Sequence, residues 1–318
     1  MGSTVESAGS TVESAGSTVE SAVARVISDP QPTVLRVEPQ EAPSLAEADQ
    51  ELVAGLRKLV VAEIDGWASD ARAEASSHCD DFTLLRFAQA RPAGLDQAIE
   101  MYRDTMAWRV KVQTNRIFAD LHPLAASSPD HKLARQCFYG GYSGVARDGA
   151  PVFVERLGRC DLAGVGNDPA VLDVMIAAYI QHLETIFRMT RALSAAKGEL
   201  VKGYIIVDAA GVSFGTLRHI SVVKTIAKIG PAYFPETTRR VMIVNAPAVL
   251  TAIWSAISPL LPPHTRAKVH ILGKEFGPAV AEHIDASQLP PFLGGTGDGS
   301  KIPEAGKVPP KTSGVALT

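Results

Sequence analysis

The pattern of apolar and polar positions predicts a set of helices followed by strands that alternate with helices. Apolar residues recur at helical spacing through residues 44–64, 81–92 and 96–110. Four later apolar runs are short and rich in β-branched residues, which is typical of buried strands. These runs are VFVERL (152–157), YIIVD (204–208), VMIV (241–244) and VHIL (269–272). A long helix is expected from 168 to about 193, and strands separated by helices indicate an α/β fold with a mostly parallel sheet.

Capping residues predict where several of these elements begin. Ser44 with Glu47 three positions later forms a capping box at the start of the first helix. Asp80 or Asp81 is expected to cap the second helix, because a carboxylate there can accept hydrogen bonds from free backbone N–H groups. The VMIV run, with no polar residue, is predicted to be a central strand that is buried on both faces.

The helix expected at 248–257 has no charged residue. The uncharged stretch continues to Leu261, and its apolar residues cover more than one face of the helix. At about fourteen residues it is too short to span a bilayer, which takes about twenty. A surface helix of a soluble protein normally carries a charged face. This helix therefore either lies in the core or covers something apolar that is not protein, and the pattern alone leaves both interpretations open.

Several short motifs resemble those of one known family. FPET precedes the VMIV strand, NAP follows it, and Pro-x-Thr-x-x-Lys (263–268) leads into VHIL. Upstream lie LLRFAQAR (84–91), a helix that ends in Trp-Arg (108–109), and Asp-Gly-x-Pro-Val (148–152). Over about residues 46–297 this combination resembles the CRAL-TRIO lipid-binding domain family, and in particular the phosphatidylinositol transfer proteins of the secretory pathway.

The resemblance implies a domain organisation. Residues 44–111 would form the N-terminal helical unit, and 112–297 the α/β domain, with a mostly parallel sheet flanked by helices and an apolar gate helix over a lipid cavity. Residues 1–43, which include three copies of GSTVESA, are expected to be disordered because they hold too little apolar surface to fold. Residues 298–318 are expected to be a flexible tail.

The resemblance also implies a set of ligand-binding residues. The residues expected to contact or support a lipid headgroup are Arg91, Glu236, Thr265 and Lys268, and those expected in the cavity or gate are Tyr142, Phe153, Leu250, Ile253, Trp254 and Ile257. Family members that also carry phosphatidylcholine have a Ser-x-Thr pair on the strand that ends here at Asp208. This chain has Gly203-Tyr204-Ile205 at that place, so the second lipid stays open.

The function implied is that of a soluble lipid-transfer protein, which binds phosphatidylinositol and exchanges it between membranes or presents it to partners. A lipid-sensing adaptor and a carrier of another hydrophobe, such as a sterol, tocopherol or retinoid, remain alternatives. Such a protein would be a cytoplasmic monomer that contacts membranes transiently, with membrane lipids as its partners.

The amino-acid composition argues against several other classes of protein. A chain of 318 residues with 46% hydrophobic and 20% charged residues is expected to be globular. A net charge of -3 gives no reason to expect a nucleic-acid partner. There is no run of eighteen apolar residues and no apolar signal core, so neither membrane spanning nor secretion is expected. The three cysteines and eight histidines show no metal-ligand spacing, so neither a metal nor a cofactor is predicted.

One motif suggests an enzyme. Gly211-Val-Ser213-Phe-Gly215 matches the GxSxG pattern of serine hydrolases and lies between a strand and a helix. The nucleophile of such enzymes directly follows its strand, whereas Asp208-Ala-Ala intervenes here. We therefore interpret Ser213 as a helix N-cap, expect no enzymatic activity, and keep the hydrolase as a remote alternative.

Overall fold

The computed structural model describes residues 45–121, 129–300 and 302, and its α/β part is built on one five-stranded sheet. The strands are β1 (Gly140–Val145), β2 (Pro151–Glu155), β3 (Gly203–Asp208), β4 (Thr238–Val244) and β5 (Val269–Ile271). They lie in the order β1-β2-β3-β4-β5, with β1 antiparallel to β2 and the other pairs parallel. The mostly parallel sheet predicted from the sequence is confirmed. The expected central strand, β4, lies inside the sheet between β3 and β5, but the middle strand is β3.

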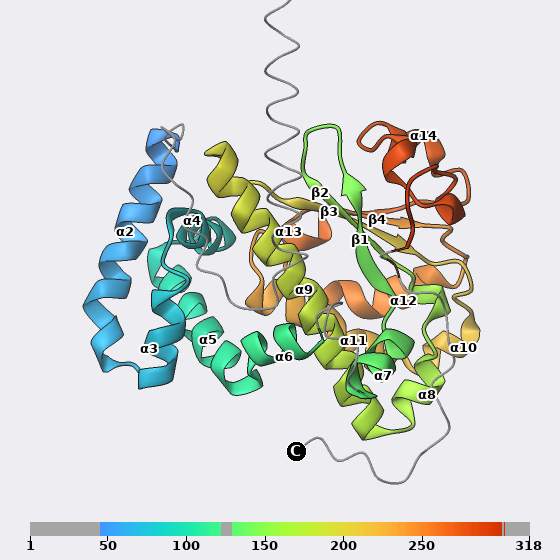
Figure 1. The fold of residues 1–318 in the computed structure, drawn as a ribbon, viewed down its shortest axis with the longest axis horizontal. Coiled ribbons are helices and arrows are strands. Elements are labelled where there is room, and N and C mark those ends of the chain that lie inside the picture. The colour runs from blue at the N-terminus through green and yellow to red at the C-terminus, as the bar shows by residue number, and fades with distance from the viewer. Residues whose placement is uncertain (1–44, 122–128, 301, 303–318) are drawn as a thin grey trace, which may run out of the picture.

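Helices before and between the strands make up most of the remaining described chain. The α-helices are α2 (Glu47–Glu63), α3 (Ser69–Ser76), α4 (Asp81–Ala90), α5 (Leu95–Val112), α6 (Thr114–Asp120), α7 (Pro129–Cys137), α8 (Leu162–Gly166), α9 (Pro169–Lys197), α10 (Phe214–Leu217), α11 (Ile220–Tyr233), α12 (Leu250–Ile257), α13 (Pro263–Arg266) and α14 (Gly277–Ala281). Short 3₁₀ turns are η1 (Ile64–Gly66), η3 (Leu157–Arg159), η4 (Ser258–Leu260), η5 (Ala286–Gln288) and η6 (Pro291–Leu293). Helices α2–α5 group at one end of the molecule and the sheet lies at the other, while α9 contacts both (Figure 1).

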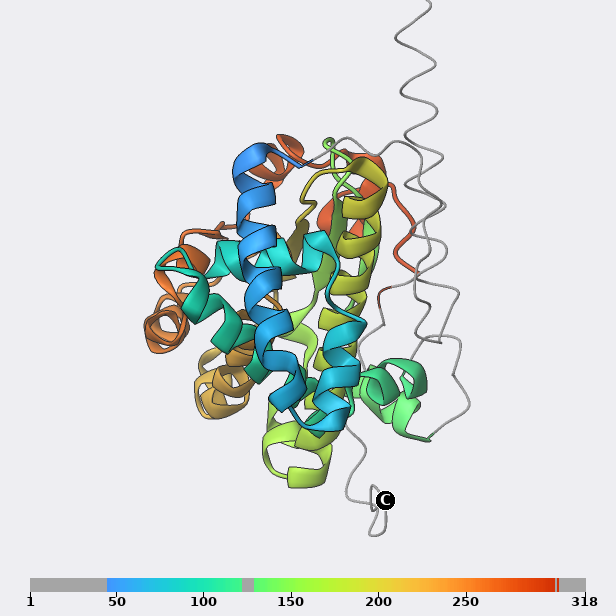
Figure 2. The same cartoon turned by 90° about the vertical axis from the view of Figure 1, so that its left-hand side faces the viewer.

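Each of these two parts has a hydrophobic core cluster of its own. Helices α2, α4 and α5 bury a cluster that includes Leu56, Leu84 and Tyr102, and Figure 2 shows these helices from their outer side. In the other core, the chain after β5 covers one face of the sheet with residues such as Val280 and Ile284. The helical unit thus has an apolar core of its own, as expected from its helical periodicity.

A buried ion network joins the helical unit to the sheet domain. Arg109 of α5 donates hydrogen bonds to both carboxylate oxygens of Glu184 on α9, at 2.8 and 3.0 Å, and one to Glu74 at 2.6 Å. Burial alone would lower the pKa of Arg109, but the two carboxylates outweigh it and raise that pKa. Burial would likewise raise the pKa of Glu184, but Arg109 and Arg188 hold it well below its usual range. Arg109 and Glu184 are therefore both charged, and each depends on the other.

Aromatic stacking adds a second contact between the two parts. The rings of Trp108 on α5 and Tyr233 on α11 are nearly parallel, at 4° and 4.0 Å between centroids. Phe234 meets the same tryptophan edge to face at 6.0 Å. Such pairs contribute about 0.5–1.5 kcal/mol beyond the area that they bury. The end of α11 is therefore fixed against the helical unit.

Most element boundaries follow the sequence prediction, with some differences. Asp80 is the N-cap of α4 as predicted, and its carboxylate accepts a hydrogen bond from the Thr83 N–H at 3.0 Å. The first helix starts at Glu47 with Ala46 at its N-cap, and Ser44 lies outside the described residues. Helix α3 was not predicted. The single helix expected from Ser213 to about residue 229 is divided into α10 and α11, and α11 continues through an internal proline.

Helix α9 is long and apolar enough to be compared with a membrane-spanning helix. It has 29 residues, and by length and composition it could cross a bilayer, but half of its most apolar window is buried inside the molecule. It packs against β2, α6, α7 and α11. These contacts are those of a core helix that packs against the sheet and its neighbouring helices. The disorder predicted for residues 1–43, and most of the flexible tail predicted for residues 298–318, lie outside the residues that the structure describes.

Candidate functional site

A cavity of about 230 Å³ lies against one face of the sheet. Strand register aligns Ile205 with Val241 and Val269, so side chains from three adjacent parallel strands point to the same side. All three line the cavity, as do Val207 and Ile243 two positions further along their strands. Val241 and Ile243 are for this reason only half-buried, which corrects the prediction that β4 is buried on both faces.

Helices form the opposite walls of the cavity, and these are largely apolar too. The lining residues are Tyr179 and Leu183 of α9, Ala227, Gly230 and Pro231 of α11, Phe234 after it, Trp254 of α12, and Leu261. The enclosure thus consists of one sheet face and three helices, which is the arrangement expected for an apolar ligand.

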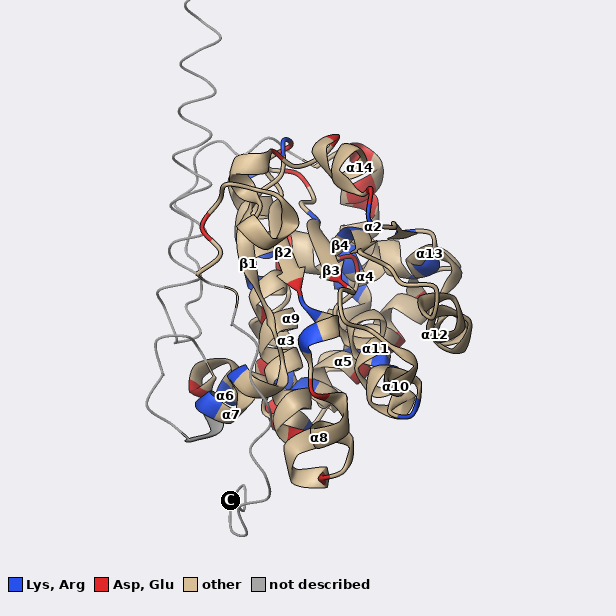
Figure 3. Ribbon diagram, turned by 90° about the vertical axis from the view of Figure 1, so that its right-hand side faces the viewer, with Lys and Arg blue, Asp and Glu red and all other residues tan. Residues whose placement is uncertain are grey.

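Helix α12 contributes less to the cavity wall than the sequence suggested. Leu250, Ile253 and Ile257 are buried in a cluster with residues of α8, α9 and α11. Of the four residues expected in a gate, only Trp254 is among those that line the cavity. The outer side of α12 is formed by small uncharged residues, and Figure 3 shows no charged position on this helix. A gate role for α12 stays a prediction.

Tyr142 and Phe153 lie on the same sheet face as the cavity but beyond its walls. They are paired across β1 and β2, and their rings meet edge to face at 5.8 Å. Phe153 is in register with the cavity-lining Ile205, which explains the shared face. Neither is among the side chains that line the cavity.

A charged cluster stands at the end of the cavity where the parallel strands begin. Lys202, Glu236 and Lys268 precede β3, β4 and β5 by one, two and one residues. Lys268 Nζ donates to Glu236 Oε1 at 2.8 Å, and Lys202 Nζ donates to the other carboxylate oxygen. The Glu236 side chain is only 9% exposed. Because adjacent parallel strands start at the same edge of a sheet, the three side chains converge there.

The titration of this cluster follows from its burial and its charges. Burial alone would raise the pKa of Glu236, but hydrogen bonds from Lys202 and Lys268 outweigh it and hold that pKa below its ordinary value. Burial lowers the pKa of Lys202, and Glu236 only partly offsets this. His264 lines the same end of the cavity, and burial lowers its pKa as well. The cluster is thus one carboxylate between two ammonium groups.

Arg86 holds the backbone at Glu236 in place. Its guanidinium donates to the Glu236 carbonyl oxygen, to the Val201 carbonyl at 2.7 Å and to Ser194 Oγ at 3.2 Å. The arginine is fully buried, and burial lowers its pKa to about 10. Glu236 itself has φ = 50°, a left-handed conformation that is uncommon outside glycine. We infer that Arg86 stabilises this unusual backbone and so fixes the direction of the Glu236 side chain.

The four residues expected at a headgroup do not all meet. Glu236, Thr265 and Lys268 line one end of the cavity. Arg91 is the C-cap of α4, and its guanidinium donates to the Ala90 carbonyl at 3.0 Å. Ala90 lines the cavity, whereas Arg91 does not.

Sequence reasoning missed three residues of this region: Arg86, Lys202 and His264. A signal existed for the first, because Arg86 is a charged residue within the otherwise apolar, buried run of α4. A buried arginine needs several hydrogen-bond acceptors, which loops of the sheet domain supply here.

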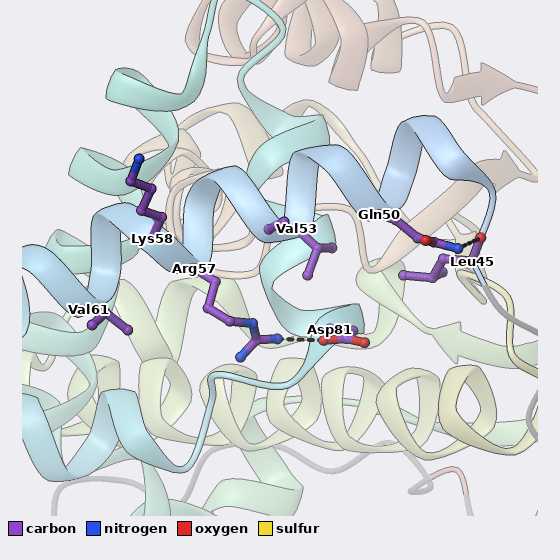
Figure 4. A pocket seen from close by; sticks show the side chains of 8 residues that line it. Leu45, Gln50, Val53, Arg57, Lys58, Val61 and Asp81 are labelled. Atoms are coloured by element: carbon purple, nitrogen blue, oxygen red, sulfur yellow. Dashed lines mark hydrogen bonds and ion pairs between the residues drawn. The ribbon is translucent and has the colours of Figure 1, made fainter.

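A second concavity, of about 510 Å³, lies on the surface of the helical unit (Figure 4). It is lined by Leu45 and by residues of α2 such as Val53 and Val61, and Arg57 pairs across it with Asp81 at 2.5 Å. It contains none of the predicted site residues.

Ser213 has the environment of a helix N-cap, which confirms the interpretation made from the sequence. Its backbone N–H donates to Thr216 Oγ1 at 3.2 Å. Within the described residues, no hydrogen bond joins its hydroxyl to a histidine, and no group of three or more His, Cys, Asp or Glu could hold a metal ion.

Comparison with known proteins adds to this geometry. The family model described as CRAL/TRIO domain matches residues 135–295, about half of the chain. The phosphatidylinositol/phosphatidylcholine transfer protein SFH9 of Arabidopsis thaliana is 31% identical over 222 residues, which cover 69% of this chain and 37% of that protein. The Sec14 cytosolic factor of Schizosaccharomyces pombe is 27% identical over 276 residues, which cover 86% of this chain and 91% of that protein. This chain thus spans less than half the length of the plant relative.

Among solved structures, the crystal structure of Sfh5 resembles this fold with a TM-score of 0.55 at 15% sequence identity. The match covers 80% of this chain and 89% of that one. At this identity the likeness concerns the fold alone.

Proposed function

This chain belongs to the CRAL-TRIO family, and from that membership we propose that it is a soluble lipid-transfer protein that binds phosphatidylinositol and exchanges it between membranes or presents it to partners. The relatives named as phosphatidylinositol/phosphatidylcholine transfer proteins and as Sec14 cytosolic factor support this class. The proposal includes a cytoplasmic monomer that contacts membranes only transiently.

The observation that carries the proposal is an apolar cavity with a charged cluster at one end. A phosphodiester needs cationic donors, and inositol hydroxyls need both donors and acceptors. Lys202 and Lys268 supply ammonium groups, and Glu236 between them supplies an acceptor. Thr265 adds a hydroxyl on the same side of the cavity. The part of the sheet face next to this cluster is formed by Ile205, Val207, Val241 and Ile243, which supply the apolar surface that acyl chains require.

The cavity volume implies that the ligand-bound protein is more open. Pockets for drug-sized ligands measure about 300–1,000 Å³, and a diacyl phospholipid is larger than such a ligand. The cavity of about 230 Å³ holds only part of one. Helix α12 is the wall that can move outward without breaking the sheet, and Leu260 beside it is exposed. We therefore expect α12 to shift when a lipid enters.

The energetics explain why a carrier is needed. Two acyl chains with about thirty methylenes cost more than about 20 kcal/mol to place in water, at roughly 0.8 kcal/mol each. A protein cavity replaces water with apolar contact, so exchange between two membranes is close to balanced. No covalent step is required for this activity.

The test is extraction and transfer of phosphatidylinositol by a Lys268→Ala variant. In that variant Glu236 keeps Lys202 as a partner, so the fold should persist. Loss of one hydrogen bond to a charged group, about 1.5–3 kcal/mol, predicts a 10- to 100-fold weaker binding of phosphatidylinositol from vesicles. The matched control is Lys274→Ala, because Lys274 is exposed and lies after β5 away from the cavity.

Equal binding by both variants would refute the headgroup assignment. Binding without transfer between vesicles would instead favour a lipid-sensing adaptor. Arg91 is tested separately in the same assay, because its guanidinium donates to the Ala90 carbonyl and its side chain does not line the cavity. Arg91→Ala should weaken binding less than Lys268→Ala does.

A further inference from the structure

A chain of hydrogen bonds connects helix α2 of the helical unit to the charged cluster. Gln89 of α4 lies between the two. Its Nε2 donates to Asp49 Oδ1 on α2 at 3.2 Å, and its Oε1 accepts from Lys202 Nζ at 3.3 Å. Lys202 also donates to Glu236, which accepts from Lys268 at 2.8 Å on its other oxygen. Side chains of the helical unit are therefore linked to the charged end of the cavity.

The chemistry of these groups fixes the direction of the Gln89 amide. A carboxylate only accepts hydrogen bonds and an ammonium only donates them, whereas an amide has one donating and one accepting end. Asp49 therefore takes the NH₂ end of Gln89, and the amide oxygen is turned to Lys202. The reverse orientation would place two donors against each other at Lys202. Gln89 thus satisfies two neighbours of opposite charge at once.

Lys202 is a partly buried cation that needs these acceptors. Its side chain is 21% exposed, and burial lowers its pKa, with Glu236 opposing this effect. The charges of Lys268 and Arg86 lower that pKa further. Within the described part of the chain, the ammonium of Lys202 donates to Gln89 and to Glu236. Without the Gln89 oxygen, the ammonium would turn toward water and away from Glu236.

Helix α4 directs two side chains to this region. Arg86 and Gln89 are three positions apart, so they are neighbours on the surface of the helix. Arg86 holds the backbone carbonyl of Glu236, and Gln89 holds Lys202, which is a partner of the Glu236 side chain. The same helix therefore restrains both the main chain and the side chain of one acceptor.

We propose that Gln89 is a positioning residue for the charged cluster, which holds Lys202 against one oxygen of Glu236. The other oxygen of Glu236 and the ammonium of Lys268 then stay directed at the headgroup. Glu236 and Lys268 line the cavity, whereas Gln89 and Asp49 do not, so the effect of Gln89 on the ligand passes through the cluster.

This role rests on the proposed function, because it concerns the same headgroup. If Lys202 turned away, Glu236 would keep Lys268 as its one ammonium partner. That closed pair would offer the phosphodiester a weaker donor and the inositol hydroxyls a weaker acceptor. Loss of Gln89 should therefore weaken phosphatidylinositol binding without any change in the residues that line the cavity.

The experiment measures how full-length variants extract labelled phosphatidylinositol from vesicles of phosphatidylcholine and phosphatidylinositol. Gln89→Met removes both hydrogen bonds at similar side-chain volume, and we expect about 3- to 10-fold weaker binding. The matched control is Gln97→Met, because Gln97 is an exposed residue of α5 and does not line the cavity. That control should bind as the wild type does.

Two further variants separate positioning from a general loss of packing. In a Lys202→Met background, Gln89→Met should have no further effect on binding, because its partner is already absent. Asp49→Asn combined with Gln89→Glu exchanges the two groups, so an amide again donates to residue 89 and a carboxylate accepts from Lys202. This exchanged variant should bind within about twofold of the wild type.

The outcomes distinguish this role from the proposed function. Gln89→Met that binds like the wild type, or that weakens binding equally with and without Lys202, overturns the positioning role alone. An exchanged variant as weak as Gln89→Met also overturns it. If Gln89→Met does not fold, as judged by its thermal unfolding, the exchanged variant decides, because it tests the same two hydrogen bonds. A wild-type protein that extracts no phosphatidylinositol overturns the proposed function, and the positioning role with it.

Discussion

Replacing Arg109 by methionine should destabilise the protein strongly, because it breaks a buried ion network without removing the carboxylates. Arg109 and Glu184 are 2% and 1% exposed, and the guanidinium also bonds to Glu74. Removing one partner of a buried pair typically costs 3–5 kcal/mol, since an uncompensated charge stays behind. Glu184 keeps Arg188 at 2.7 Å, so we expect the lower end of that range, about 3 kcal/mol.

The measurement is urea unfolding of Arg109→Met and wild type, followed by circular dichroism. A loss of about 3 kcal/mol corresponds to a fall in Tm of roughly 6–12 °C for a protein of this size. The matched control is Arg116→Met, which breaks a pair with Asp120 whose side chains are 63% and 60% exposed. That change should stay within about 0.5 kcal/mol.

A second substitution tests the reason for the loss. If the cost arises from the charge left on Glu184, then Glu184→Gln in the Arg109→Met background should recover at least about 1 kcal/mol. The reasoning fails if Arg109→Met costs under about 1 kcal/mol, or if the double variant is as unstable as the sum of both single variants.

Two further predictions concern a histidine and a glycine. Burial, and then the charges of Arg109 and Arg191, hold the pKa of His78 well below 6.5, so its stabilising contribution is complete above pH 6.5 and is lost as the pH falls. Relative to the His78→Gln variant, the free energy of unfolding of the wild type, measured in urea, should fall by up to about 1.4 kcal/mol per pH unit between pH 6.5 and 5. Parallel plots of that free energy against pH for the two proteins would contradict this. A Cβ at Gly158 would lie 2.0 Å from the Ala210 carbonyl oxygen, so Gly158→Ala should cost about 1–3 kcal/mol by thermal unfolding, and an unchanged Tm would disprove the close contact.

The sequence predicted the sheet well because strand periodicity and helix caps are local signals. The VMIV run marks β4, and Asp80 marks the start of α4, each from residues adjacent in the chain. Helix α3 escaped prediction because it is short, with few large apolar residues, and owes its place to packing against α5. The half-exposure of Val241 and Ile243 could not be predicted either, because a strand facing a cavity and a strand facing a core have the same composition.

The candidate site was only partly predictable for a similar reason. Glu236, Thr265 and Lys268 were found through their motif, and they do line one end of the cavity. Lys202 belongs to the same cluster but follows from strand register, which no single stretch of sequence contains.

The contacts between α5, α9 and α11 limit how far the sheet domain is an independent module. Cutting the chain at the edge of the matched region, 135–295, would take Arg109 away from Glu184 and Arg86 away from the Glu236 carbonyl. It would also uncover Tyr233 by removing Trp108. We therefore expect the smallest unit that folds alone to be larger than the matched region, and recombination with a foreign helical unit would have to reproduce these three contacts.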